Sequence, residues 1–490
     1  MAEKPRAIDH PASDHVEKMS GDVEITQTET LQIDSVEIRR LLRKIDLRLL
    51  PLLTVLYVLS FMDRSNIGNA RVAGMNTDLA LTGPQYNMAL TVFFFPYALF
   101  EVPSNVVLKM MRPSRWMCIL VIIWGTVLTL QGIVKTYEQL LVTRIFLGVA
   151  EAGFFPAATY ILTTWYCRWE YQTRVAIFFS AASLAGSFSG LLAFGIQHME
   201  GIAGLGGWRW IFILEGILTV LIGVIIPWAL PDSPETASFL TQDEKTILIH
   251  RLRQDAGTQA REDSSEKFQW KYFRAAFVDY EFILVLSCIG ATAPNIIRQL
   301  GYSAANAQLL TIPIYLVGAI ATYGLAKISD RRKARWPFVI IPFCISGVGL
   351  IALLSIPHPR LPGLTYAFLF CIPAGLYPAV IGCISWVSNN LAPSWKRAIG
   401  MAFLMTLGSS GGAVGANIFL DEQAPRYPLA YGLSLGVVVA GICAAMVLRF
   451  AVDRTNAKRD AIPESEIRAK YTEEELHELG DSSPMFRYVK

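Results

Sequence analysis

Four charged residues lie inside apolar stretches of the chain: Asp63 and Arg64, which are adjacent, and Arg144 and Glu151, which are seven positions apart. A charge at the centre of a bilayer costs roughly 2.5–3.5 kcal/mol or more unless it is paired or faces water, so such residues mark a functional pathway by default. The alternative for Asp63 and Arg64 is a position at a helix end, among the lipid headgroups.

These residue types suit the handling of an anion and a proton. Seven residues are nearly two helical turns, so Arg144 and Glu151 face the same way, about 10 Å apart along the axis. The planar fork of an arginine fits a carboxylate, which makes Arg64 and Arg144 candidate substrate ligands. A desolvated carboxyl near the midplane can bind and release a proton, which indicates Glu151 first and Asp63 second. Polar links between helices are the alternative role for all four.

Composition places the chain among membrane proteins. Of its 490 residues, 53% are hydrophobic and only 17% are charged, whereas soluble proteins average about 25% charged residues. The net charge of +3 gives no support to nucleic-acid binding. The seven cysteines form no CxxC pair, and no P-loop, HExxH or GxSxG motif occurs. The chain is therefore not expected to be an enzyme or to hold a metal or cofactor; a proton gradient is the expected energy source.

Apolar runs of about twenty residues, the length that crosses a bilayer, predict a fold of twelve transmembrane helices in two six-helix bundles. The runs cover residues 48–70, 85–108, 115–134, 138–162, 174–197, 208–230, 277–297, 306–328, 336–356, 364–388, 397–420 and 430–451. The predicted division is an N-terminal tail (1–44), a first bundle (45–231), a linker (232–275), a second bundle (276–453) and a C-terminal tail (454–490). Within the linker, Thr241 and Glu244 have the spacing of a helix-capping box.

Lysine and arginine predict the orientation. With both termini inside, the short cytoplasmic loops hold twelve of these residues and the outer loops hold six. This asymmetry favours cytoplasmic termini. We therefore expect a multi-pass protein, most simply a monomer in the plasma membrane.

Further polar and aromatic residues in the spans are candidate ligands. Trp386, Asn389 and Asn390 on the tenth span, with Tyr377, offer rings and amides to a substrate, although packing is the alternative for each. Glu215 follows Arg209 by six residues and is predicted to be its structural partner.

Several strings together resemble the major facilitator superfamily over residues 45–455, and more narrowly its anion:cation symporters and the fungal allantoate permease group. The strings are Asp63–Ala70, Glu101–Asn105, Arg112–Trp116, Arg144–Pro156, Trp208–Phe212 with Glu215-Gly216, Pro231–Pro234 and Trp386–Asn390. The resemblance implies proton-coupled movement of organic anions by rocking of the two bundles. It also implies gating roles for the loop residues Arg112, Arg115, Asp330 and Arg331, although Ala326 stands where the superfamily usually has Gly.

The seventh span departs from the family. Between Phe282 and Ile297 only about sixteen apolar residues occur, interrupted by Pro294, which is short for a crossing. A broken helix and a segment lost from the gene model are the two interpretations, and the second predicts extra residues between Asp279 and Pro294. The leading functional hypothesis is inward symport of a small carboxylate, vitamin or ureide; export of a secondary metabolite and a non-transporting nutrient sensor are the alternatives.

Overall fold

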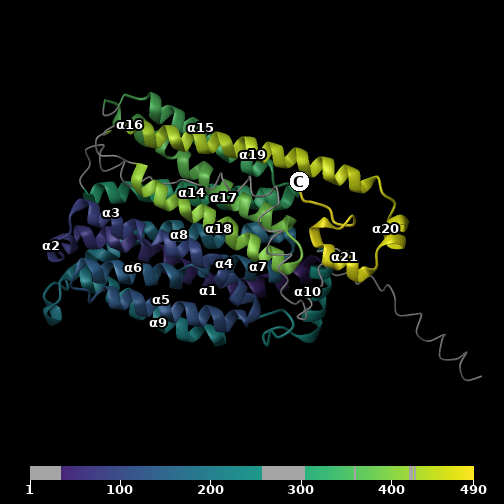
Figure 1. Ribbon diagram of the computed structural model, residues 1–490, viewed down its shortest axis with the longest axis horizontal. Coiled ribbons are helices and arrows are strands. Elements are labelled where there is room, and N and C mark those ends of the chain that lie inside the picture. Colours follow the sequence, from purple (N-terminus) through teal and green to yellow (C-terminus); the bar gives the residue numbers. More distant parts are fainter. Residues whose placement is uncertain (1–34, 256–303, 358–359, 419–422, 424–425) are drawn as a thin grey trace, which may run out of the picture. The chain divides into compact units, whose positions relative to one another are not determined.

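The computed structural model describes residues 35–255, 304–357, 360–418, 423 and 426–490 (Figure 1). All regular elements in these ranges are helices, which confirms the all-helical prediction there. Nine helical segments among them are long and apolar enough to cross a membrane, and α8 and α18 cover two further predicted spans. The short seventh span lies outside the described residues. The chain divides into residues 1–44 and a main unit, residues 45–490, and the contacts below belong to the main unit.

The first half of the main unit contains the predicted spans one to six. Its long helices are α1 (Ser35–Val72), α3 (Gly83–Thr91), α4 (Phe94–Met110), α5 (Pro113–Gln131), α6 (Tyr137–Glu151), α7 (Phe154–Trp165), α8 (Arg168–Gln197) and α9 (Gly207–Ala229). Two short elements connect them, α2 (Met75–Asp78) and η1 (Ile202–Gly204). The second and fourth predicted spans are thus each divided into two successive helices.

The second half contains the later spans. Its helices are α14 (Ala304–Arg332), α15 (Pro337–Ser355), α16 (Pro362–Leu369), α17 (Cys371–Asn390), α18 (Ser394–Ile418) and α19 (Pro428–Asp460). Three short elements follow, α20 (Glu464–Lys470), α21 (Glu473–Leu479) and η4 (Gly480–Ser482). Helix α19 therefore continues seven residues beyond the end of the predicted second bundle at residue 453.

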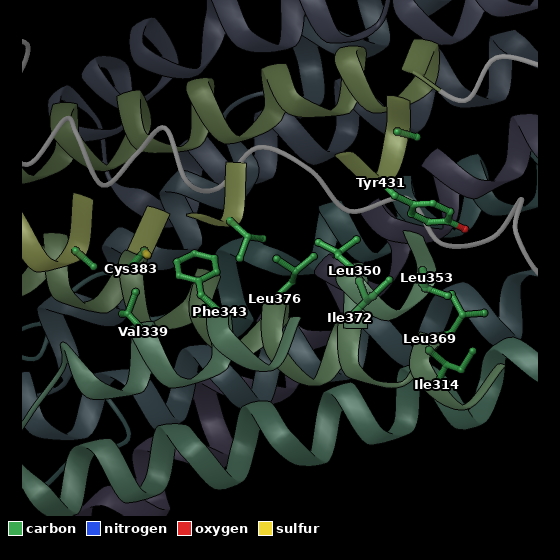
Figure 2. Packing of buried hydrophobic residues seen from close by; sticks show 14 of the residues in the cluster. Ile314, Val339, Phe343, Leu350, Leu353, Leu369, Ile372, Leu376, Cys383 and Tyr431 are labelled. Atoms are coloured by element: carbon green, nitrogen blue, oxygen red, sulfur yellow. The ribbon is translucent and has the colours of Figure 1, made fainter. Parts of the chain in front are cut away.

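Apolar packing holds the second half together. Buried side chains of α14, α15, α16, α17 and α19 form one cluster (Figure 2). Figure 2 shows Phe343, Leu350 and Leu353 of α15 in a row with Leu376 and Ile372 of α17. Burying one such side chain stabilises the fold by about 1.5–3 kcal/mol relative to exposure to water. This cluster is apolar, and Asp63, Glu101, Glu151 and Glu215, four buried acids, lie instead in the first half.

Local signals in the sequence set the ends of the helices that matter for the site. The side-chain oxygen of Thr136 accepts a hydrogen bond from the Gln139 backbone N–H at 3.4 Å and so caps α6, the helix that carries Arg144 and Glu151. In the linker, α10 (Gln242–Asp255) begins with reciprocal bonds of 2.9 and 3.3 Å between Thr241 and Glu244. The predicted capping box is therefore confirmed.

The most extensive contacts between the two halves run along two helix pairs, α4 with α18 and α8 with α14, and α17 with α8, α18 with α7 and α18 with α3 add smaller ones. At the ends of these helices nearest the linker, the side-chain amide of Asn105 donates to the Ala398 carbonyl at 2.8 Å, and Lys109 donates to the Ser394 hydroxyl at 2.7 Å. We call this end of the bundles the linker side. The halves are joined there by polar contacts.

The last residues, 480–490, which we call the C-terminal segment, pack against the linker side of the second half, where the mark C stands in Figure 1. The Lys490 carbonyl accepts a hydrogen bond from the Arg335 backbone N–H at 2.8 Å. Asp481 and Lys396 form an ion pair of 2.6 Å with side chains only 3% and 5% exposed. The segment is thus an integrated part of the second half.

Candidate functional site

Arg64 and Glu151 form an ion pair between α1 and α6. The Nε atom of Arg64 lies 2.9 Å from Oε1 of Glu151, and the Ser60 hydroxyl, one turn earlier on α1, donates to the same oxygen. The Glu151 side chain is fully buried, whereas 33% of the Arg64 side chain remains exposed. Because the pair uses only Nε, the guanidinium keeps donors for a further ligand.

Two aromatic rings hold the Arg64 guanidinium in place. Its central carbon lies 4.7 Å from the centre of the Tyr97 ring and 5.7 Å from that of Phe93. Both rings come from the neighbourhood of the α3–α4 junction. Cation–π contacts of this kind orient a guanidinium at a modest energetic gain of about 0.5–2 kcal/mol. The arginine is therefore positioned before any ligand arrives.

Arg144 is a second cation in the same region, but it is not paired in the same way. Its side chain is 3% exposed, and neither Nε nor Nη2 has a hydrogen-bond partner among the described residues. Asp63 and Glu151 are the acids within its electrostatic range, and the Tyr86 hydroxyl is also near. A buried guanidinium with open donors is costly unless an anion or water satisfies it.

Asp63 and Glu215 bring two more carboxyl groups to this region, from α1 and α9. Asp63 is 0% exposed and Glu215 is 2% exposed. The side-chain amide of Asn66 donates to Oε2 of Glu215. The predicted partnership of Glu215 with Arg209 is wrong: Arg209 instead pairs with Asp78 at 2.9 Å, because Arg209 lies at the first turn of α9, nearly two turns from Glu215.

Glu101 of α4 is a fourth buried acid, and it faces the other half. It is 0% exposed, and its Oε1 accepts a hydrogen bond from Ser409 of α18 at 3.4 Å. One turn away, the Thr406 hydroxyl donates to the Ala98 carbonyl at 3.2 Å. A buried acid of the first half therefore lies at the contact with the second half.

The second half contributes aromatic surface at mid-helix. Tyr377 of α17 stacks on Tyr315 of α14 with ring centres 6.4 Å apart, and Phe179 of α8 meets Tyr377 edge-on at 5.6 Å. Phe179 also lies 6.0 Å from Tyr57, one turn before Phe61 on α1. Tyr377 is thus connected through rings to the helix that carries Arg64.

The structure gives Trp386, Asn389 and Asn390 contacts within the chain rather than with Tyr377. The Trp386 indole donates to the Val489 carbonyl at 2.8 Å, and the side-chain oxygen Oδ1 of Asn390 accepts from the Val489 N–H at 2.7 Å. Asn389 adjoins the Arg168 carbonyl at the start of α8. The three residues lie at the end of α17, where the C-terminal segment contacts Trp386 and Asn390, and their binding of a substrate stays a prediction.

Of the predicted gating residues, Asp330 joins the two halves. Its Oδ2 accepts from the Thr173 backbone N–H of α8 at 2.9 Å, and its Oδ1 pairs with Arg335 at 2.7 Å. Arg335 is fully buried and also donates to Gln172 of α8. Burial lowers the pKa of the Arg335 guanidinium, and Asp330 opposes that shift. Arg335, at the centre of this network, is not among the residues predicted from the sequence.

The other predicted gating residues are Arg112, Arg115 and Arg331. Arg112 and Arg331 are exposed. Arg112 precedes α5, whose first turn is fixed by a 2.8 Å hydrogen bond from the Ser114 backbone N–H to Asp232, and Arg115 lies in that turn. Among the residues described, no group of three or more His, Cys, Asp or Glu side chains could hold a metal ion.

The buried charges of this region do not balance when all are ionised. Four carboxyls, those of Asp63, Glu101, Glu151 and Glu215, are buried in the first half, against the two guanidinium groups of Arg64 and Arg144. Their fully ionised sum is −2, which is unfavourable in a medium of low dielectric constant. Bound protons relieve that excess, and the open donors of the arginines suit a carboxylate.

Comparisons with known proteins identify relatives along most of the chain. The family model described as Major Facilitator Superfamily matches residues 53–416. An MFS-type transporter from Penicillium expansum, cnsO, is 36% identical over 474 residues, covering 92% of this chain and 90% of that protein. The high-affinity nicotinic acid transporter of Saccharomyces cerevisiae is 34% identical over 464 residues, covering 92% and 85%. Among solved structures, the proton:xylose symporter XylE aligns with a TM-score of 0.61 at 14% identity, covering 81% of this chain and 94% of that one.

Proposed function

The chain belongs to the major facilitator superfamily, and we propose that this membrane transporter moves a small organic anion in symport with protons. Arg64 and Arg144 both offer N–H donors that the described part of the protein does not itself use. Arg64 is oriented by two rings and keeps one third of its side chain exposed, while Arg144 is buried with open donors. Both are ready to bind a carboxylate through paired N–H groups.

Competition for Arg64 supplies the coupling. An anion that binds Arg64 draws the guanidinium away from Glu151, whose only described ionic partner is Arg64 at 2.9 Å. Glu151 is then a buried carboxylate without a cation in contact, and it binds a proton because the neutral form needs no counter-charge. Asp63 is a second proton-binding candidate. Anion and proton thus enter together and leave together.

The aromatic surroundings favour a planar carboxylate. Rings of Tyr97 and Phe93 flank Arg64, and the stacked Tyr315 and Tyr377 face the first half through Phe179. A relative with 34% identity is named a high-affinity nicotinic acid transporter, and nicotinate is such a carboxylate. We therefore choose nicotinate as the first probe, and we propose that both termini lie on the cytoplasmic side of the plasma membrane.

Uptake by purified protein in liposomes tests this proposal. The protein is given an inward proton gradient and radiolabelled nicotinate, with acetate, pantothenate and allantoate as further labelled probes. We expect accumulation of at least one of these anions that collapses when a protonophore is added. Uptake of none of them above protein-free liposomes, or uptake unaffected by the gradient, would overturn the proposal for this class of substrate.

A further inference from the structure

Asp63 and Glu215 are two buried acids of the first half that no cation contacts among the described residues. Among the residues that the structure describes, neither carboxylate oxygen of Asp63 has a hydrogen-bond partner, and Oε1 of Glu215 has none either. Asp63 lies three positions before Asn66 and therefore on the same face of α1, and Asn66 donates to Oε2 of Glu215. The two buried carboxyl groups thus meet the same face of α1, and Glu215 is the charged neighbour that acts most on Asp63.

The groups around this pair come from four helices besides α9. Helix α1 supplies Arg64 and Asn66, and α5 supplies the indole of Trp124 beside Asp63. Helix α6 supplies Glu151 and Arg144, and α8 supplies Ser189. Arg64 is paired with Glu151. Arg144 is therefore the remaining cation among these groups that could neutralise Asp63 or Glu215. Neither its Nε nor its Nη2 lies within hydrogen-bond distance of either carboxyl.

Close packing of α5 against α9 fixes Glu215 at this place. A Cβ atom on Gly216 would lie 2.7 Å from the Gly125 carbonyl oxygen, and one on Gly125 would lie 2.8 Å from the Gly216 oxygen. Only glycines permit this approach of the two backbones. Because Glu215 precedes Gly216, the same contact fixes the backbone of α9 at Glu215, whose side chain meets Asn66 of α1.

Hydrogen bonds also orient the Glu215 carboxyl. The side-chain amide of Asn66 donates to Oε2 of Glu215. The side-chain oxygen of Asn66, Oδ1, accepts from the Ser189 hydroxyl at 3.4 Å. Ser189 in turn accepts from Asn69 at 2.8 Å. The side-chain amide of Asn66 therefore presents its N–H group to Oε2 of Glu215. The other oxygen of Glu215, Oε1, stays available to the carboxyl group of Asp63.

We propose that Asp63 and Glu215 form a carboxyl–carboxylate pair that holds one proton between them, which makes Glu215 a proton-binding residue of this transporter. Two adjacent buried carboxyls cannot both remain ionised, because each charge disfavours the other. One O–H then donates to the neighbouring carboxylate oxygen. The part of this proposal that concerns coupling depends on the proposed symport, but the shared proton does not.

Infrared spectroscopy of the purified full-length protein tests the pair without any substrate. Protonated carboxyl groups have a C=O stretching band that ionised carboxylates lack, and the band is followed as pH is raised. We expect a titrating band in the wild type. In Glu215→Gln, Asp63 loses its acidic neighbour, so the band attributed to the pair should titrate at a pH lower by about one unit or more. In Asp63→Asn, Glu215 loses its acidic neighbour, so the remaining band should likewise titrate at a lower pH.

The matched control is Glu138→Gln, which changes a glutamate in the first turn of α6, outside the buried region, and should leave the titration unchanged. No titrating protonated-carboxyl band in the wild type would overturn the pair without any variant. An unchanged midpoint in either Glu215→Gln or Asp63→Asn would do the same. If the shifts are found but no anion is taken up with protons, the symport proposal fails and the pair stands. Coupled uptake with unshifted bands would instead support the symport and overturn the pair.

Discussion

Glu151 of α6 accepts hydrogen bonds on a single carboxylate oxygen from both Ser60 and Arg64 of α1, and its contact with Arg64 measures 2.9 Å. The second oxygen has no partner among the described residues. One carboxyl therefore connects the two helices that carry all four charges identified from the sequence. Half of its hydrogen-bonding capacity is therefore unused.

We predict that Arg144→Lys lowers anion uptake by about 10- to 100-fold, the effect of losing one charged hydrogen bond or slightly more. Lysine keeps the charge but not the planar fork. The measurement is initial uptake of the best anion in liposomes, at equal reconstituted protein. Arg360→Lys, at an exposed position, is the control, and equal rates in both variants would contradict the role of Arg144.

Glu151→Gln should abolish accumulation driven by a proton gradient and keep exchange of labelled for unlabelled anion. Glutamine matches the protonated form of the residue in shape and charge, so the anion can bind and cross but no proton is carried. Both modes are measured in the same liposomes. Accumulation that persists in this variant would assign the proton to Asp63 or to another acid.

The sequence predicted most of the fold because its signals are long. Eleven of the twelve apolar runs coincide with described helices, and the seventh lies outside the described residues. The breaks in α3–α4, α6–α7 and α16–α17 were not predicted, since hydropathy does not distinguish a continuous helix from two that follow each other. The capping box at Thr241 was predicted correctly because both of its bonds are local.

Contacts between residues far apart in the sequence could not be predicted from local patterns. Asp63, Arg64, Arg144 and Glu151 were chosen from charges in apolar runs, and the structure brings them together. Arg209 was paired wrongly with Glu215 because only proximity along the chain was visible. The contacts of Trp386 and Asn390 with Val489 join residues about 100 positions apart, and no local pattern indicates them.

The C-terminal segment should contribute to stability through one buried ion pair. Asp481→Asn leaves Lys396 as a buried charge without its acid, which costs about 3–5 kcal/mol, and the melting temperature in detergent should fall clearly. Glu464→Gln, in the exposed pair with Arg468, should change stability by less than about 0.5 kcal/mol. Similar melting temperatures for both variants would show that Asp481 is not buried in this way.

Asp330→Asn should loosen the linker side. The substitution weakens the contacts with Thr173 and leaves Arg335 buried without its acid. Spin labels at the exposed positions Arg112 and Arg331, in a background without native cysteines, report the separation of the halves. We expect longer distances in the variant than in the parent or in the exposed control Asp243→Asn. An unchanged distribution would mean that this network does not hold the halves together.

The most direct test of the account is whether protons move with the anion. Liposomes containing the purified protein and an internal pH-sensitive dye are mixed, without a pH gradient, with an inwardly directed gradient of the transported anion. Proton symport predicts acidification of the interior by the wild-type protein and none by Glu151→Gln. Anion entry without acidification in the wild type would contradict proton symport.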